Sequence, residues 1–338
     1  MADHYLNPYS NTNFFEFFQV LLMRCYQFLT ATLEGNGMMA DEIQMVVLGC
    51  VAVSAGLVGA FLMLRKMTML ANSISHTILV GIVGAFLLTK VPVDGFESGE
   101  GLLPMGALLG AALIMGIVTS LLTEFLTKTV RLQEDASLGL VFTTLFAIGI
   151  LMVTLLTRNA HIGAEVVMGN VDALHVDDCK LVFLVMCVNI ILIFIFYKQY
   201  KLTTFDSSLA RALGFSTVFY NYLLMTQASA TVVGAFRAVG VLMVLSFITG
   251  PALTARLLTN DLRRMLALAA LLGVTASLVG VALSRHFLTV NGISLSTAGV
   301  VVCVIALQYL LVLFCVPSTG LIAKWRHRKK LIEARAKL

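Results

Sequence analysis

The sequence has too few charged residues for a soluble protein. Asp, Glu, Lys and Arg together make up 12% of its 338 residues, whereas soluble domains carry about 25%. Hydrophobic residues make up 59%, and the mean hydropathy is +0.94. A globule of this size could not bury so much apolar side chain beneath a polar surface. The composition therefore excludes a soluble enzyme and a disordered chain, and it indicates a polytopic membrane protein.

The sequence also lacks the short motifs of common catalytic and metal centres. It contains no CxxC, GxxxxGK[ST] or HExxH pattern, so we expect no catalytic residues and no ATP hydrolysis through a P-loop on this chain. The six cysteines do not suggest a disulfide framework, because most of them lie within apolar runs, where cysteine packs as a small hydrophobe.

What the sequence does contain is continuous apolar runs of about twenty residues, the length of a membrane-spanning helix. Backbone polar groups in lipid must be satisfied within their own segment, so the runs predict helices and an all-α fold. We expect eight or nine transmembrane helices, at residues 44–64, 68–89, 102–127, 138–157, 181–197, 219–236, 238–258, 265–284 and 297–316. The count is eight if the sixth and seventh segments, separated only at Arg237 and Ala238, form one helix.

The chain divides into three parts by composition. Residues 1–43 form an extension in which Phe14, Phe15, Phe17 and Phe18 suggest an amphipathic helix at the membrane interface. Residues 44–316 form the transmembrane domain, and residues 317–338 form a basic tail. Such a tail suits anionic lipid, so we expect no nucleic-acid partner.

Lysine and arginine are concentrated in alternate connections, and such connections face the cytoplasm. With the C-terminus placed there, that side holds Arg65, Lys66, Lys128, Arg131, Lys198, Lys201, Arg211, Arg256, Arg263, Arg264 and the basic tail. The other side holds fewer cationic residues: Arg24, Lys90, Arg158, Lys180, Arg237 and Arg285. We therefore expect a cytoplasmic C-terminus and an N-terminus on the opposite side.

One spanning segment carries polar side chains that could bind a metal. Asn72, Ser75 and His76 are spaced three and four residues apart, so they share one helix face. Polar groups at membrane depth normally face the bundle interior or a water-filled path, and imidazole is a good ligand for Mn, Fe or Zn. Hydrogen bonding between packed helices is an equally good interpretation.

A second segment, FDSSLARALGF, predicts a short amphipathic helix in a cytoplasmic connection. Asp206 is a good N-cap, Gly214 suits the C-terminal end, and Leu209 and Leu213 lie one turn apart. The helix could dock into a groove on a soluble partner or simply cover the end of the bundle. Its residues are Phe205, Asp206, Ser207, Ser208, Leu209, Ala210, Arg211, Ala212, Leu213 and Gly214.

Three smaller signals concern the ends and contacts of helices. Glu134 and Asp135 precede a span, where carboxylates offset the positive helix end or, less simply, assist metal release. Gly250 and Pro251 should kink or break their helix. Gly106 and Gly110 form a GxxxG pair, which suggests close helix packing.

At these segments the chain resembles the integral-membrane permeases of bacterial ABC importers for manganese, zinc and iron. The resemblance covers about residues 46–316 and is carried by four segments in the family's order: LRKMTMLANSISHTILVGIVGAFLL, QEDASLGLVFTTLFAIG, FDSSLARALGF and AVGVLMVLSFITGPALTARLLT. It implies a type II-like importer fold in the bacterial inner membrane.

The resemblance also implies partners and roles. The chain would form a homodimer, or a pair with a sister permease, and would work with a cytoplasmic ABC ATPase and an extracytoplasmic metal-binding lipoprotein. FDSSLARALG would be the coupling helix that receives the ATPase's motion, and His76 would be a metal ligand in the path. The family commonly has Asp at the position of Asn72, so the site is weaker, another acid substitutes, or the metal preference differs.

An alternative function is a secondary metal transporter driven by protons. Such a protein would need further acids or histidines within its spans, and usually an inverted repeat. Apart from His76, the predicted spans contain few such groups.

Overall fold

The computed structural model describes residues 8–9, 12–30, 38–89, 105–157, 171–174 and 176–315, and these contain helices and no strand. The expected all-α fold is therefore confirmed, while the basic tail, residues 317–338, lies outside the described residues. The elements are α1 (Phe14–Leu29), α2 (Ala40–Leu64), α3 (Thr68–Thr89), α5 (Met105–Lys128), α6 (Glu134–Thr157), η1 (Val171–Ala173), α8 (Val176–Ile195), α9 (Tyr197–Phe205), α10 (Ser207–Ala212), α11 (Thr217–Val239), α12 (Val241–Leu258), α13 (Leu262–Asn291) and α14 (Thr297–Cys315).

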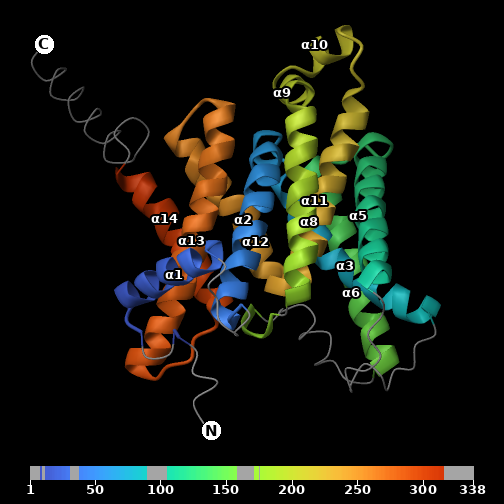
Figure 1. Ribbon diagram of the computed structural model, residues 1–338. Helices are drawn as coiled ribbons and strands as arrows, with labels where there is room; N and C mark the ends of the chain where they lie inside the picture. Colours follow the sequence, from blue (N-terminus) through green and yellow to red (C-terminus); the bar gives the residue numbers. More distant parts are fainter. Residues whose placement is uncertain are drawn as a thin grey trace, which may run out of the picture.

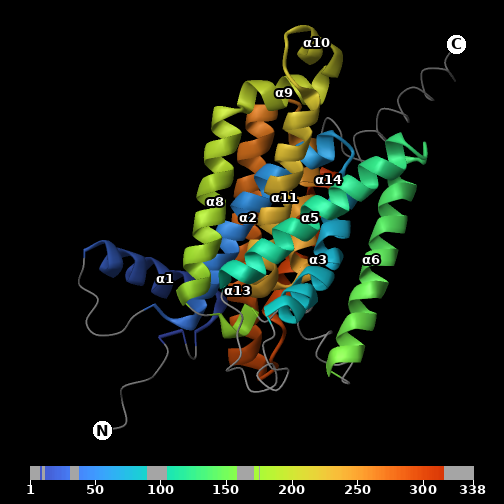
Figure 2. The same cartoon turned by 90° about the vertical axis from the view of Figure 1, so that its right-hand side faces the viewer.

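A long helix occurs at each of the nine segments expected to span the membrane. By length and apolar composition, five helices of the described part are able to cross a bilayer: α2, α6, α8, α13 and α14. The total of eight or nine spans stays a prediction. The long helices run side by side as a bundle, with α9 and α10 at one end and α1 lying across the other (Figures 1 and 2).

The boundary between α11 and α12 differs from the sequence prediction. We expected a turn at Arg237 and Ala238, but α11 continues to Val239 and the chain turns at Gly240. Gly240 has a φ of 77°, a left-handed conformation that glycine adopts without steric cost. The two segments are therefore separate helices joined by one residue.

Helix α2 is the centre of the bundle. Most of its residues are buried, and it packs against α8, α11, α12 and α13. Glycines allow the closest of these approaches. A Cβ on Gly59 would lie 2.0 Å from the backbone oxygen of Ile248 in α12, and one on Gly56 would lie 3.1 Å from the backbone of Ala269 in α13. Helix packing of this kind depends on small residues at the contact.

Polar side chains also join α2 to its neighbours inside the bundle. The Asn189 side chain of α8 donates hydrogen bonds to Ser54 Oγ (2.6 Å) and to Thr231 Oγ1 of α11 (2.7 Å), and all three residues are buried. Hydrogen bonds between buried polar groups add specificity to packing that is otherwise apolar.

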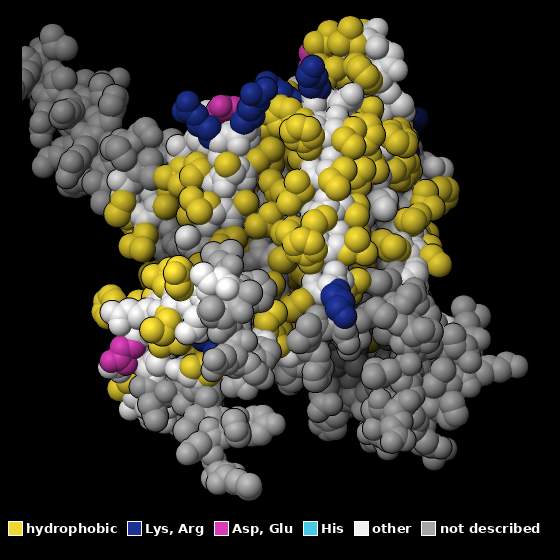
Figure 3. Space-filling model, in the orientation of Figure 1, with side chains coloured by type: hydrophobic (Ala, Val, Ile, Leu, Met, Phe, Trp, Pro, Cys, Tyr) yellow, Lys and Arg dark blue, Asp and Glu magenta, His cyan; other side chains and the backbone are white. Residues whose placement is uncertain are grey.

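Lysine and arginine gather at the end of the bundle that carries α9 and α10 (Figure 3), hereafter the α10 end. Arg263, at the start of α13, lies over the ring of Tyr197 in α9 at 5.6 Å. At the opposite end, ionic contacts hold α2 to its neighbours: Arg285 of α13 pairs with Asp41, and Arg24 of α1 pairs with Glu42.

The N-terminal extension is attached at this opposite end. Tyr9 donates a hydrogen bond to Glu42 Oε1 at 3.0 Å, and burial raises the pKa of its phenol, so the phenol remains a donor. Phe17 of α1 is buried, whereas Phe15 and Leu22 are exposed. Helix α1 thus has one face packed on the bundle and an apolar face that is left open.

Replacing Asp41 with asparagine should lower the thermal midpoint of the detergent-solubilised protein markedly. The Asp41 side chain is only 4% exposed, and the change leaves the Arg285 guanidinium without its carboxylate. Breaking a buried pair from one side costs about 3–5 kcal/mol, and we expect the lower end because Arg285 is one-fifth exposed. The same change at the exposed Asp135 is the control. Equal midpoints for the two variants would contradict a stabilising role for the pair.

Candidate functional site

His76 projects from α3 toward α6. Its ring centroid lies 5.0 Å from that of Phe142 and 5.1 Å from that of Phe146, both in α6. The side chain is half-buried, and its Nδ1 is buried with no hydrogen-bond partner in the described part of the chain. A buried imidazole nitrogen without a partner is uncommon, so this atom has capacity for a ligand.

The structure does not assemble the rest of the predicted metal site around His76. Ser75 is buried and donates its hydroxyl to the carbonyl of Ala71 in its own helix at 2.8 Å, and Asn72 is half-buried one turn away. No group of three or more His, Cys, Asp or Glu side chains that could hold a metal occurs among the described residues. His76 is therefore one potential ligand and not a complete site.

Neighbouring polar groups of α3 serve helix packing. Ser73 donates to the carbonyl of Leu138 in α6 at 3.2 Å, and the hydroxyls of Thr77 and Thr119 of α5 lie 2.8 Å apart. These bonds hold α3, α5 and α6 together, so they fix the position of His76 relative to α6.

The short helix expected at residues 205–214 forms as predicted. Asp206 caps α10 by accepting hydrogen bonds from the backbone nitrogens of Ser208 (3.1 Å) and Leu209 (2.9 Å). At the other end Gly214 has a φ of 84°, and the Phe215 nitrogen donates to the Ala210 carbonyl at 2.9 Å. This is the Schellman arrangement, in which a left-handed glycine ends a helix.

The apolar side chains of this helix face outward. Phe205, Leu209 and Leu213 are 58%, 46% and 59% exposed, whereas Ala210 is buried. Leu209 and Leu213 lie one turn apart on the same face of α10 and form a ridge, hereafter the α10 ridge. Phe205 is the last residue of α9 and precedes the break in the helix at Asp206. Because α10 stands beyond the ends of the long helices (Figures 1 and 2), the ridge is available to a partner and does not cover the bundle.

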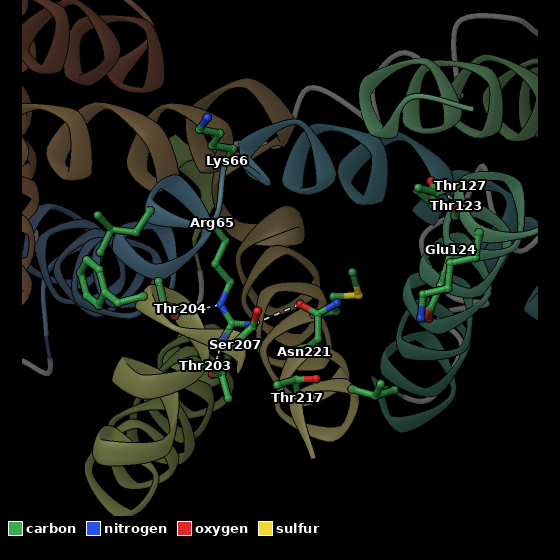
Figure 4. A pocket seen from close by; sticks show the side chains of 15 residues that line it. Arg65, Lys66, Thr123, Glu124, Thr127, Thr203, Thr204, Ser207, Thr217 and Asn221 are labelled. Atoms are coloured by element: carbon green, nitrogen blue, oxygen red, sulfur yellow. Dashed lines mark hydrogen bonds and ion pairs between the residues drawn. The ribbon is translucent and has the colours of Figure 1, made fainter. Parts of the chain in front are cut away.

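A cavity of about 550 Å³ lies beside α10 at the same end. Arg65 and Lys66 line it from the turn after α2, Glu124 from α5, Ser207 from α10 and Asn221 from α11 (Figure 4). Glu124 pairs with Lys128 through Oε1, while its Oε2 is buried with no partner within the described residues. Figure 4 shows Arg65 and Glu124 on opposite walls.

Arg65 makes the most connections in this cavity. Its Nε donates to Thr204 Oγ1 (3.0 Å), its Nη2 to Thr203 Oγ1 (2.7 Å) and its Nη1 to Asn221 Oδ1 (3.0 Å). Burial lowers the pKa of the guanidinium, and the nearby Tyr200 opposes that shift. From the sequence, Arg65 is predicted only to be one of the cations that mark the cytoplasmic side. The one local signal was its place directly after an apolar helix, where a cation offsets the negative helix end.

The remaining predicted residues have local roles in the structure. The backbone of α6 begins at Glu134, and Asp135 is exposed. Helix α12 continues through Pro251, so the alternative that this proline breaks the helix is wrong. A Cβ on Gly250 would lie 2.2 Å from Ile305 of α14, so this glycine permits a close helix contact.

Comparison with known families decides the class of protein. Residues 39–316 match the model of the ABC 3 transport family. The chain belongs to this family. Three relatives of this chain, each matching most of its length, carry names that agree with this family.

A "Probable metal transport system membrane protein" of Chlamydia muridarum is 39% identical over 305 residues, which are 90% of this chain and 93% of the relative. The "Manganese transport system membrane protein MntD" of Bacillus subtilis is 34% identical, over 81% and 91% of the two chains. The "Zinc transport system membrane protein TroD" of Treponema pallidum is 33% identical, over 81% and 73%. These names describe transport subunits, which confirms that this ABC 3 family chain is a permease and not an enzyme.

A solved structure supports the same fold. "PsaBC from Streptococcus pneumoniae in complex with Fab" matches with a TM-score of 0.70 at 25% identity, covering 87% of this chain and 97% of that chain. The helical bundle of this ABC 3 family member is therefore the bundle of an ABC transporter permease.

Proposed function

We propose that this chain is the permease subunit of an ABC importer that moves a divalent transition metal across the bacterial inner membrane. The observation that carries the proposal is the exposed α10 ridge at the lysine- and arginine-rich end of a bundle whose sequence has no P-loop motif. A permease that cannot hydrolyse ATP needs a docking element for an ATPase on its cytoplasmic side. The α10 end is then cytoplasmic, as is the C-terminus.

The partners follow from this assignment. A cytoplasmic ABC ATPase docks on the α10 ridge, an extracytoplasmic metal-binding lipoprotein delivers the metal at the opposite end, and a second permease, either a copy of this chain or a sister subunit, completes the path. Because this chain alone does not supply a full set of metal ligands within its described residues, a paired path accounts for the missing ones.

The transported metal is manganese, zinc or iron, as cargo and not as a resident cofactor. The names of relatives support manganese and zinc. His76 binds the passing metal, with Asn72 and Ser75 on the same helix as weaker oxygen donors. Asn72 brings no negative charge, so binding at this point is weak enough for release. The backbone of α6 begins at Glu134 and Asp135, where carboxylates would offset the positive helix end or assist metal release.

Replacing His76 with alanine should lower ATPase-dependent uptake of Mn²⁺ by about ten-fold or more, since even residues that only support a metal ligand typically contribute that much. Uptake is measured in cells that lack their own importers and that co-express the ATPase and the lipoprotein. His286→Ala is the matched control, because His286 is also half-buried and its Nδ1 also has no partner in the described structure.

The outcomes separate the alternatives. If uptake depends on the ATPase but persists in His76→Ala, then His76 contributes to helix packing and does not bind the metal. Uptake without the ATPase would favour a proton-driven secondary transporter. Running the same assay with Zn²⁺ and Fe²⁺ identifies the cargo.

A further inference from the structure

Arg65 joins three parts of the molecule that are far apart in the sequence. It belongs to the end of α2, its partners Thr203 and Thr204 belong to α9, and Asn221 belongs to α11. Helices α9 and α11 are the two elements that flank α10 in the chain. A single side chain therefore connects both supports of α10 to the central helix of the bundle.

The turn after α2 holds Arg65 in place. The nitrogen of Lys66 donates to the Met63 carbonyl (3.0 Å) and that of Met67 to the Leu62 carbonyl (2.8 Å), again a Schellman arrangement. Here the left-handed residue is Lys66, with a φ of 61°, which costs about 1–2 kcal/mol relative to an ordinary conformation. Helix α3 starts at Thr68, so Arg65 is fixed to both α2 and α3.

Within the described residues, the hydrogen-bond partners of Arg65 are all neutral. Each of the three hydrogen bonds ends on a hydroxyl or amide oxygen and none on a carboxylate. A carboxylate would lock a buried guanidinium in one arrangement, because separating such a pair costs several kcal/mol. Hydroxyl and amide acceptors hold the guanidinium while leaving exchange between them inexpensive. The cavity beside it gives α9 and α11 room to shift.

A displacement that reaches α2 spreads through the bundle. At Gly59 and Gly56 the helix is in backbone contact with α12 and α13, and packed backbones at this distance move together. Through the Lys66 turn, α2 is also continuous with α3, which carries His76.

We propose that Arg65 is the positioning residue that transmits movement of α10 to α2 and α3, and so couples the ATPase to the metal path. The inference rests on the proposed function and adds the element that carries the motion. Arg65 contacts neither the ATPase nor the metal. It acts by linking α9 and α11 to α2, so that a shift of the helices that flank α10 reaches the central helix.

The test uses the complete transporter, permease with ATPase and lipoprotein, in proteoliposomes loaded with ATP on the ATPase side. Two rates are measured on each sample, Mn²⁺ uptake and ATP hydrolysis. In Arg65→Gln we expect ATPase co-purification and hydrolysis to continue, while Mn²⁺ moved per ATP falls by about ten-fold, within the usual range of coupling between sites. In Arg65→Lys the amount of Mn²⁺ moved per ATP should lie between the values of the native protein and of Arg65→Gln. Lysine supplies one compact ammonium in place of the planar guanidinium.

Two further variants separate transmission from simple stability. Lys201→Gln removes an exposed cation from α9 and should leave the ratio unchanged. Thr203→Val with Thr204→Val removes the α9 acceptors and should lower the ratio as Arg65→Gln does, and combining all three changes should add little. This pair also tests the link if Arg65→Gln fails to fold.

An unchanged ratio of Mn²⁺ to ATP in Arg65→Gln would overturn the inference. So would uptake and hydrolysis that fall in proportion, since that result means lost assembly. Additive effects of the arginine and threonine changes would show that they act separately and would likewise overturn it. Failure of the proposed function itself is recognised differently, because the native transporter would then show no ATP-driven Mn²⁺ uptake.

Discussion

Replacing Leu209 and Leu213 together with aspartate should abolish co-purification of the ATPase with this permease. Both leucines stand on the α10 ridge, about half exposed and available for burial in a partner. Burying a leucine side chain is worth about 1.5–3 kcal/mol, so losing two costs at least about 3 kcal/mol, and desolvating two carboxylates adds to this. A loss of this size weakens binding by more than about a hundred-fold.

The measurement is a pull-down from detergent-solubilised membranes through a tag on the permease. Ser208→Asp with Ala212→Asp is the matched control, since it adds the same two charges, one turn apart, at exposed positions of α10 away from the ridge. ATPase retained by the Leu209 and Leu213 variant would refute docking on the ridge. Equal loss in both variants would assign the effect to charge and not to the ridge.

Replacing Gly59 with alanine should prevent the transmembrane domain from folding stably. The added Cβ would lie 2.0 Å from the backbone oxygen of Ile248, well inside any real contact distance. No side chain can rotate away, so α12 must move from α2. Overpacking a core usually costs about 1–3 kcal/mol, and a clash with backbone belongs at or above the top of that range.

The yield of monodisperse protein in detergent and its thermal midpoint report this effect. Gly49→Ala is the control, because Gly49 lies in the same helix with no described atom within 4 Å of the added Cβ. Alanine there should stabilise the helix by about 0.5–1 kcal/mol. A folded, equally stable Gly59→Ala protein would mean that α2 and α12 are not in the contact described.

Much of the fold follows from local sequence. The long apolar runs predicted each long helix, and the position of α10 followed from Asp206 and Gly214, whose capping chemistry acts within a few residues. Where the predictions were wrong, a contact or conformation outside the local pattern decided the result. Gly240, with its positive φ, sets the turn that charge had suggested at Arg237, and α12 continues through Pro251.

The close contacts between helices also could not be predicted from local sequence alone. The GxxxG pattern pointed to Gly106 and Gly110, but a Cβ on Gly110 would meet no described atom within 4 Å. Among the described glycines the tightest approach is instead at Gly59, which belongs to no GxxxG pair. A glycine's role depends on the helix that lies opposite, and that helix is nearly two hundred residues away in the case of Ile248.

The candidate site was predictable only in part, for the same reason. The polarity of His76 stands out in an apolar run, but the aromatic rings beside it belong to α6, and Ser75 bonds to its own helix. Arg65 is connected to residues 138, 139 and 156 positions away. Nothing in its neighbourhood in the sequence marks those partners.

The helices of the bundle differ in how much of their surface is buried, and this difference determines which helix unfolds locally first. Helix α2 is buried along most of its length, whereas most of α6 is exposed and its contacts are chiefly with α3 and α5. Local opening is cheapest where few buried contacts must be given up. Thermal fluctuations should therefore concentrate in α6, the helix whose Phe142 and Phe146 flank His76, while α2 opens only when the whole bundle does. His76 thus lies against one of the least buried helices of the described bundle.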